Sequence, residues 1–343
     1  MIEYADVIVD LQQGDCGKGA VSNYLIGKEN YTHVVRYNGS NNAGHSIYLD
    51  GKKIVTHSIP AGILHGVKSI ISFGCVLNVD HFFKELKDLQ DSNIKTDNLI
   101  KIANNTHIVT KYHLEEDGTD TKIGTTKRGN GPAYRDKYNR KGTRAFEIKE
   151  LQPYLIDIYD EFYNEEKCRI LFEGAQGFYL DVDWGDYPYV TSSHCTVGSA
   201  VMNGVPPQRI RKIYGVAKIY ETYVGAKKFE TDNPIFEQIR KLGNEYGATT
   251  GRPRQCNFLN LNNLIKAIKV NGVTDLVIRK IDILEKLNTF TISYNNELLN
   301  FDTIDNMKNY IANKIEVEQI YWADDPSSIG TEHYIQRFEK SIF

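Results

Sequence analysis

Residues 10–20, DLQQGDCGKGA, have the residue types of a loop that binds phosphate. Three glycines lie in it: Gly14, Gly17 and Gly19. Glycines allow tight turns in which backbone N–H groups face an anion, and Lys18 adds a positive charge. A standard P-loop follows this lysine with a Ser or Thr that holds Mg²⁺, whereas this chain has Gly19. Asp15 and Cys16 therefore stand beside Lys18 with no role that the P-loop pattern explains. The alternative for this segment alone is a tight turn with a solvated lysine.

Glycine, amide, hydroxyl and basic residues gather in five further segments: RYNGSNNAGHS (36–46), IGTTKRGNGPAYRDKYNRKGTR (123–144), FEGAQG (172–177), YPYVTSS (187–193) and GATTGRPR (247–254). His45 lies between small residues in the first of these, which is unusual for an ordinary surface histidine. The second could be a solvated basic loop, but its hydroxyls and glycines favour phosphate binding. The last offers two hydroxyls and two arginines, which suits a carboxylate ligand.

The elements that must position these segments alternate between strands and helices. Short β-branched or apolar runs predict strands over residues 6–11, 33–39, 69–79, 169–174, 212–220 and 275–282. Helical spacing predicts helices over 20–27, over 80–90 behind a capping Asp80, and over 262–272 closed by Gly272. This order predicts an α/β fold, a single elaborated P-loop-NTPase-like domain over residues 1–343 around a mostly parallel sheet whose strand ends carry the site.

The composition sets outer limits on function. The chain has 343 residues, 41% hydrophobic and 25% charged, with a formal net charge of -3. That charge argues against a nucleic-acid partner, and no long apolar run predicts a membrane span, so we expect a cytoplasmic protein. The five cysteines show neither disulfide nor zinc-site spacing.

The motifs together resemble those of the adenylosuccinate synthetase family. GDCGKG, NAGHS, IGTTKRGNGPAY, FEGAQG, YPYVTSS, GATTGRPR and RKID follow in the family's order over most of the chain. The family joins aspartate to the 6-position of a purine nucleotide. The resemblance implies a ligase that uses Mg²⁺ and either ATP or GTP as phosphoryl donor.

The resemblance also implies catalytic roles. Asp15 would remove the proton from N1 of the purine, so that the 6-oxo group attacks the γ-phosphate. His45 would stabilise or protonate the leaving phosphate oxygen, and Lys18 would neutralise the transferring group. Mg²⁺ would be held by Asp15 and by the carbonyl of Gly44, which replaces the missing P-loop hydroxyl.

Binding roles follow in the same way. The residues that match the monophosphate nucleotide site are Asn42, Thr125, Thr126, Gln176 and Thr191, with Arg140 reaching across from a second subunit of a homodimer. The residues that match the aspartate loop are Thr249, Thr250, Arg252 and Arg254. Lys280 and Asp282 match the pair at the base of the triphosphate, where a carboxylate suits guanine.

Cys16 departs from the family, because a glutamate stands there in most members. A bacteriophage subfamily, the 2-aminoadenylosuccinate synthases, has a small residue at this position and uses dGMP instead of IMP. The sequence therefore predicts, first, a ligase acting on dGMP for diaminopurine DNA synthesis and, second, an adenylosuccinate synthetase acting on IMP with GTP. A nucleotide-binding switch without catalysis is the remote alternative.

Overall fold

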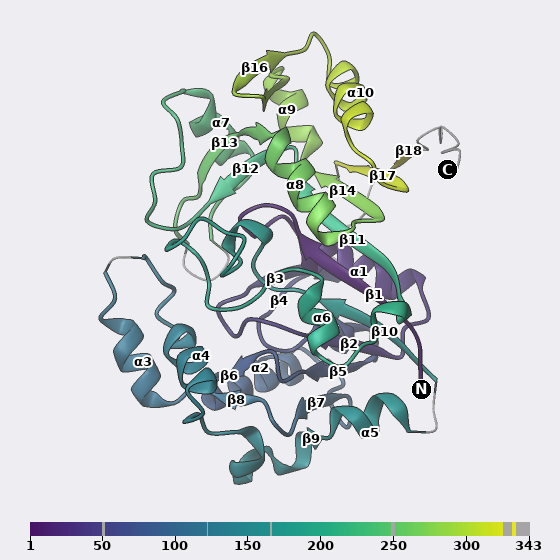
Figure 1. Cartoon of the computed structure of the whole chain (residues 1–343), viewed down its shortest axis with the longest axis vertical. Helices are drawn as coiled ribbons and strands as arrows, with labels where there is room; N and C mark the ends of the chain where they lie inside the picture. The colour runs from purple at the N-terminus through teal and green to yellow at the C-terminus, as the bar shows by residue number, and fades with distance from the viewer. Residues whose placement is uncertain (50–51, 122, 165–166, 248–250, 325–330, 334–343) are drawn as a thin grey trace.

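The computed structural model describes residues 1–49, 52–121, 123–164, 167–247, 251–324 and 331–333 (Figure 1). Within these ranges ten strands form a central sheet in the order β18-β17-β14-β11-β1-β10-β2-β5-β7-β9. Every neighbouring pair in it is parallel except β17 and β18. The predicted α/β fold with a mostly parallel sheet is confirmed.

The strands are β1 (Ile2–Asp10), β2 (His33–Arg36), β3 (His45–Leu49), β4 (Lys52–Thr56), β5 (Lys68–Ile71), β6 (Val76–Leu77), β7 (Ile100–Ala103), β8 (His107–Ile108), β9 (Leu155–Ile156), β10 (Cys168–Glu173), β11 (Ile210–Lys218), β12 (Tyr220–Tyr223), β13 (Gln255–Asn260), β14 (Asp275–Arg279), β15 (Thr291–Tyr294), β16 (Glu297–Asn300), β17 (Gln319–Ala323) and β18 (Thr331–His333). The helices are α1 (Lys18–Lys28), α2 (Val79–Asp91), α3 (Lys111–Gly118), α4 (Asn130–Tyr138), α5 (Ile158–Tyr163), α6 (Gly198–Met202), α7 (Ile235–Leu242), α8 (Leu261–Asn271), α9 (Ile281–Leu287) and α10 (Ile304–Lys314). None of these helices is long and apolar enough to cross a bilayer.

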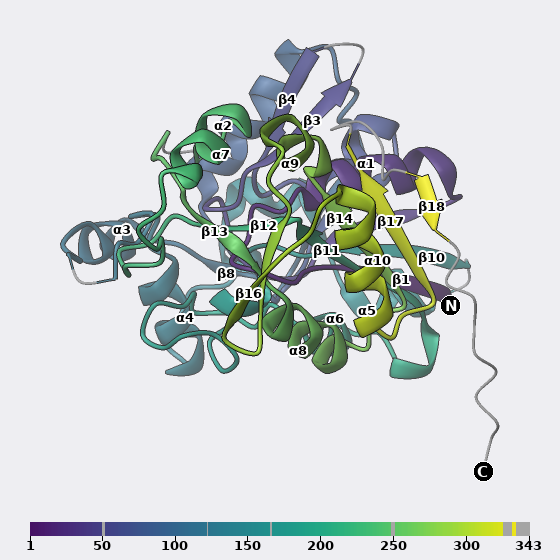
Figure 2. The ribbon, with the colours of Figure 1, turned by 90° about the horizontal axis from the view of Figure 1, so that it is seen from above.

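Helices cover both faces of the sheet, with α1 and α2 on one side and α5, α6 and α8 on the other (Figure 2). Strand alternation explains this arrangement, because successive side chains point to opposite faces. On β1, Ile8 packs in one apolar cluster with Val21 and Leu25 of α1. Its neighbour Val7 packs in another with Leu264 of α8. That second cluster draws on residues from Ile2 to Trp322, as a single domain would require, and the single domain stays a prediction.

Several predicted boundaries were wrong: the strand predicted over 33–39 ends at Arg36, the one predicted over 212–220 ends at Lys218, and three further cases have clear causes. The run 69–79 is two strands, β5 and β6, because the chain turns at Gly74, where a Cβ would lie 2.0 Å from the carbonyl of Tyr37. Helix α2 is capped by Asn78, whose side chain accepts from the His81 amide at 2.8 Å, and Asp80 lies inside the first turn. The run 275–282 ends as a strand at Arg279 and then enters α9. The helix closed by Gly272, whose φ is 61°, is confirmed.

Polar side chains stand at the carboxyl ends of five neighbouring strands in the sheet. These last residues are Arg279 of β14, Lys218 of β11, Asp10 of β1, Glu173 of β10 and Arg36 of β2. Carboxyl ends of parallel strands meet at one edge, which is where α/β proteins bind their ligands. The fold therefore directs attention to this edge.

Candidate active site

A cavity of about 700 Å³ lies at this edge of the sheet. Most residues that the sequence selected line it: Gly14, Asp15, Gly17, Lys18, Gly19, Asn42, Gly44, His45, Thr125, Thr126, Gln176, Thr191, Arg252, Arg254 and Lys280. They come from loops that are far apart in the chain, so the fold gathers the motifs into one site.

Other selected residues lie elsewhere. Cys16 is buried behind the loop, and Asp282 pairs with Lys286 at 2.7 Å on the surface of α9. Arg140 is exposed just after α4, outside the cavity lining. Thr249 and Thr250 lie outside the described residues.

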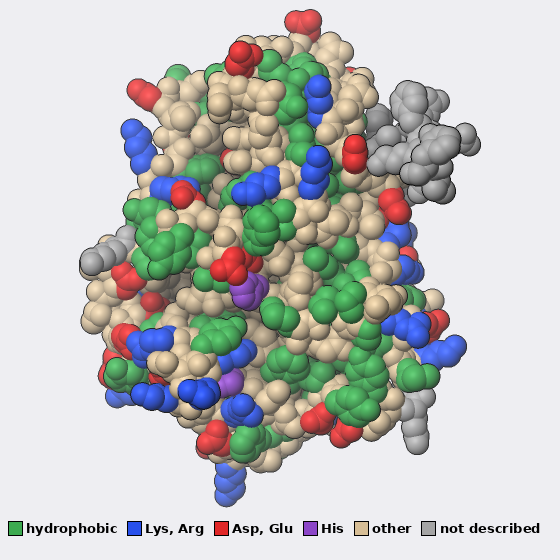
Figure 3. Space-filling view, in the orientation of Figure 1, with side chains coloured by type: hydrophobic (Ala, Val, Ile, Leu, Met, Phe, Trp, Pro, Cys, Tyr) green, Lys and Arg blue, Asp and Glu red, His purple; other side chains and the backbone are tan. Residues whose placement is uncertain are grey.

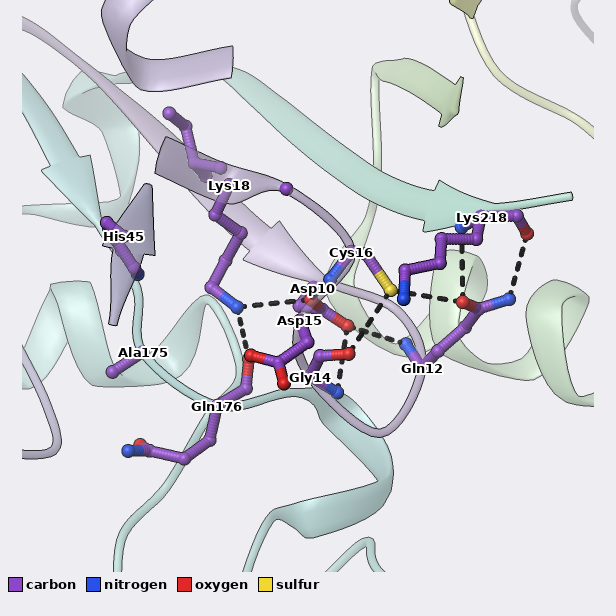
Figure 4. A network of polar contacts seen from close by, with 12 residues as sticks. Asp10, Gln12, Gly14, Asp15, Cys16, Lys18, His45, Ala175, Gln176 and Lys218 are labelled. Atoms are coloured by element: carbon purple, nitrogen blue, oxygen red, sulfur yellow. Dashed lines mark hydrogen bonds and ion pairs between the residues drawn. The ribbon is translucent and has the colours of Figure 1, made fainter. Parts of the chain in front are cut away.

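The carboxylate of Asp10 organises the glycine loop from within (Figure 4). Its Oδ1 accepts from the amides of Gln12 at 3.0 Å and Gly14 at 3.2 Å, and its Oδ2 accepts from the amide of Cys16 at 3.0 Å. Lys18 Nζ contacts Oδ2 at 3.1 Å and also donates to the carbonyl of Gln176. The amides of Gln12, Gly14 and Cys16 therefore bind an internal carboxylate.

The Arg279 side chain packs against the backbone of Gly17. Its φ of 99° suits glycine, and a Cβ on it would lie 2.4 Å from Arg279 Nη1. That same atom donates to the Gly17 carbonyl at 3.0 Å. The positive φ thus favours glycine here, and a larger residue would also displace the Arg279 guanidinium.

Asp15 faces the cavity and forms an ion pair with Arg254. Arg254 contacts Asp15 Oδ2 through Nε at 3.0 Å and Nη2 at 2.9 Å, and the Asp15 side chain is 39% exposed. Burial opposes ionisation, but Arg254, Lys218 and Lys18 outweigh it and lower the pKa of the Asp15 carboxyl. Asp15 is therefore a carboxylate at neutral pH.

The Cys16 side chain points away from the cavity. Its Sγ lies 3.0 Å from Gln12 Oε1 and 3.5 Å from the Gly14 carbonyl, on the side of the loop nearer Lys218 (Figure 4). Burial and the charge of Asp10 raise the pKa of this thiol, so it is neutral. A link between Cys16 and the choice of purine therefore has no direct contact with the cavity to support it.

His45 belongs to a buried triad with Arg36 and Glu173. His45 Nδ1 donates to Glu173 Oε1 at 2.5 Å, and Arg36 Nη2 donates to the same oxygen at 2.5 Å. Arg36 Nη1 lies 3.3 Å from His45 Nε2. Burial and then Arg36 lower the pKa of His45 to about 4, so the imidazole is neutral at pH 7.

Sequence reasoning missed several residues of this site. Glu173 and Arg36 stood inside quoted motifs, and Asp10 began the glycine loop, yet none was given a role. Each ends a strand of the central sheet, and that position was the available signal. Lys218 also ends a strand, β11, and so offered the same signal. Glu245, which contacts Lys218 at 2.7 Å, carried no signal in the sequence alone.

Comparison with known proteins decides the family. The sequence profile of the adenylosuccinate synthetase family matches residues 7–155 and 145–326. This chain belongs to the adenylosuccinate synthetase family. It is 37% identical to the adenylosuccinate synthetase of Thermodesulfovibrio yellowstonii, over 85% of this chain and 82% of the relative. It is 34% identical to that of Bacillus cytotoxicus, over 96% and 92%.

Two solved structures are similar to this one. The adenylosuccinate synthetase of Plasmodium falciparum has a TM-score of 0.81 and 25% identity, over 96% of this chain and 99% of that one. Cyanophage S-2L succinoaminodeoxyadenylate synthetase has a TM-score of 0.75 and 23% identity, over 97% and 96%. The second likeness concerns the fold alone.

Membership of the adenylosuccinate synthetase family makes the chain a C–N-forming ligase that requires Mg²⁺ and a nucleoside triphosphate. The donor atoms at the cavity fit this ion. Both Arg254 contacts with Asp15 use Oδ2, so Arg254 does not occupy the other carboxylate oxygen, Oδ1. Gly44, whose backbone carbonyl is the second expected ligand, lines the same cavity. Carboxylate and carbonyl oxygens are the ligands that Mg²⁺ prefers.

Proposed function

We propose that this adenylosuccinate synthetase homologue joins L-aspartate to the 6-position of a purine nucleoside monophosphate through a 6-phosphoryl intermediate. One observation carries the proposal: Asp15, Lys18, His45 and Arg254 all line a single cavity. A base, two groups that stabilise phosphoryl charge and a carboxylate-binding arginine are the parts that this chemistry needs. A nucleotide sensor would need no aspartate-binding arginine.

In the first step, the Asp15 carboxylate accepts the N1 proton while the purine O6 attacks the γ-phosphorus of the triphosphate. The O6–P bond forms, the bond from phosphorus to the bridging oxygen breaks, and a nucleoside diphosphate leaves. In the second step, the aspartate amine attacks C6, the C6–N bond forms and the C6–O6 bond breaks. Inorganic phosphate leaves with O6 and takes up the proton that the amine loses. Phosphorylation thus turns a poor leaving group into a good one.

Lys18 and His45 act on the phosphates. Lys18 lies at the start of α1, where the helix dipole also favours negative charge. A phosphate approaching His45 would raise its pKa, because an opposite charge favours the imidazolium. Glu173 behind Nδ1 supports that charge, so that Nε2 can donate a proton to the leaving oxygen. Mg²⁺, held by Asp15 and the Gly44 carbonyl, would neutralise charge on the phosphates.

We assign separate groups of cavity residues to each of the three substrates. Asn42 Oδ1 accepts from Gln176 Nε2 at 3.0 Å, and we assign this pair, with Thr125, Thr126 and Thr191, to the monophosphate nucleotide. Arg252 and Arg254, with Thr249 and Thr250, are assigned to aspartate, and Lys280 to the triphosphate. A preference for GTP requires Asp282 to turn from Lys286 toward the base, so the donor is either GTP or ATP.

IMP is the first candidate acceptor and dGMP the second. The relatives at 34–38% identity are named adenylosuccinate synthetases, which favours IMP with GTP. Cys16 stands where most family members have a glutamate, so the loop lacks a second carboxylate beside Asp15, which favours dGMP. The cyanophage protein binds dGMP, with dATP as energy donor. Because the Cys16 thiol does not line the cavity, its influence on the acceptor would be indirect, through the loop.

One incubation tests the reaction and the acceptor. The protein is mixed with Mg²⁺, aspartate and GTP or ATP, and IMP or dGMP is offered separately, with mass spectrometry of the succinyl adduct. Adduct from IMP supports the first candidate, and adduct from dGMP alone overturns it in favour of the second. Nucleotide binding without either adduct contradicts the ligase and favours a switch.

We also propose a homodimer with shared sites, supported by the exposure of Arg140 beyond its own cavity. Basic side chains gather in this region, at the lower left of Figure 3, around α4. Mixing Arg140→Ala with Asp15→Asn subunits tests it, because a mixed dimer has one site with both intact residues. Activity above that of either variant supports sharing, and no recovery in a proven mixed dimer contradicts it.

A further inference from the structure

Arg254 stands between two carboxylates that differ in exposure. On the cavity side it holds Asp15 Oδ2, and on the interior side its Nη1 contacts Glu245 Oε2 at 2.6 Å. The side chain of Asp15 is 39% exposed, whereas that of Glu245 is 1% exposed. An incoming ligand can therefore compete for the Asp15 side of the guanidinium but not for the Glu245 side.

Glu245 is fixed by two further donors. Lys218 Nζ contacts Oε2 at 2.7 Å, and the Tyr220 hydroxyl donates to Oε1 at 2.7 Å. Lys218 also donates to Thr222 Oγ1 at 2.8 Å. Burial opposes ionisation of Glu245, but Lys218 and Arg254 outweigh it and lower its pKa to about 2. The carboxylate is therefore charged and rigid over the working pH range.

The four charged groups alternate in sign along a chain: Asp15, Arg254, Glu245, Lys218. Such a chain has no net charge, which makes its burial tolerable. If a carboxylate of a ligand replaces Asp15 beside Arg254, the alternation is kept.

We propose that Glu245, fixed by Lys218 and Tyr220, is a positioning residue that holds Arg254 at the cavity wall, so that this guanidinium can pass from Asp15 to a carboxylate of the aspartate substrate while keeping its second ion pair. The inference rests on the proposed function, because it takes aspartate as the ligand. Without Glu245, Arg254 has no interior partner and closes on Asp15.

The scaffold extends to the glycine loop. Gln12 Nε2 donates to the Lys218 carbonyl at 3.0 Å, and its Oε1 accepts from the Lys218 amide at 3.1 Å and lies 3.0 Å from Cys16 Sγ. Lys218, at the end of β11, thus binds Gln12 of the loop that carries Asp15 through its backbone, and it binds Glu245 through its side chain. This shared support keeps the two partners of Arg254 in register.

The test uses Glu245→Gln, and Glu245→Gln combined with Lys218→Met, which removes both buried charges and leaves no lone cation. Initial rates are measured against aspartate, purine monophosphate and triphosphate in turn. We expect the KM for aspartate to rise roughly 10- to 100-fold, the size of a lost charge-assisted hydrogen bond. The nucleotide KM values should change less than about threefold. Glu245→Asp, which keeps the charge, should recover part of the aspartate affinity.

The matched control is Asp275→Asn with Lys212→Met, a pair at 2.8 Å with Asp275 buried at the start of β14, away from the cavity. It should lower stability without a selective rise in the KM for aspartate. An unchanged KM for aspartate in folded Glu245 variants, or an equal rise for all substrates, would overturn the positioning role. Protection against heat by aspartate is measured in parallel. If the wild-type protein makes no adduct, the proposed function fails. The heat measurement still tests Glu245: loss of protection by aspartate in the Glu245 variants supports the positioning role, and unchanged protection contradicts it.

Discussion

Replacing Glu173 by Gln isolates the role of the buried triad behind His45. Both Glu173 oxygens are engaged: Oε1 by Arg36 and His45, and Oε2 by the Ser22 hydroxyl at 2.8 Å and the Ala61 amide at 3.0 Å. The Glu173 and Arg36 side chains are 0% and 2% exposed. Removing one charge of such a pair leaves the other buried and unpaired, which costs about 3–5 kcal/mol of unfolding free energy.

The same substitution should lower kcat. A carboxylate that receives Nδ1–H fixes the tautomer of His45 and supports its protonated form, and the loss of such support typically costs roughly 10- to 100-fold. The upper limit is the contribution of His45 itself, roughly 10²- to 10⁴-fold if it acts as a general acid. We therefore expect Glu173→Gln to lie between wild type and His45→Gln in kcat, with KM values nearly unchanged.

The assays are urea unfolding followed by circular dichroism and initial rates of adduct formation. Ser22→Ala is the control, because it removes one hydrogen bond from the other oxygen and leaves His45 paired. It should cost about 1 kcal/mol and leave kcat within about threefold of wild type. If Glu173→Gln lowers stability but leaves kcat at the wild-type value, the triad is structural only. If neither changes, the buried ion pair itself is refuted.

Three further substitutions test other parts of the site and core. Asp15→Asn should abolish phosphoryl transfer, which is measured as nucleoside diphosphate release. The protein should stay folded, because this side chain is partly exposed. Normal release of nucleoside diphosphate would show that Asp15 is not the base. Cys16→Glu is predicted to lower the use of dGMP relative to IMP by shifting the loop through Gln12, with Cys16→Ser as control; an unchanged ratio would show that selection lies elsewhere. Burial raises the pKa of Glu221 from 4.5 to about 8. Its contribution to stability is therefore full below pH 4.5 and is lost as the pH rises through about 8. Glu221→Gln should raise the unfolding free energy at pH 8 by a few kcal/mol, with the gap closing toward pH 5, and equal gaps at both pH values would contradict the assignment.

The sequence predicted the fold class and most of the cavity wall. Apolar runs gave the central strands, and the helix closed by Gly272 ends where the glycine stands. Boundaries failed where a tertiary approach set them, as at Gly74, which has room only for a backbone against Tyr37. A local pattern cannot register a neighbour that lies 37 residues away.

By itself, then, the sequence determined which chemistry the chain can perform, because its motifs carry a base, phosphate-binding groups and carboxylate-binding arginines. Only the tertiary structure decided which of them meet. Arg254 reaches Asp15 across 239 residues, and Glu173 reaches Arg36 across 137. Packing also turned the Cys16 thiol toward Gln12 and away from the cavity. Side-chain direction and charge pairing depend on neighbours that only the folded sheet brings together, and composition and spacing do not contain them.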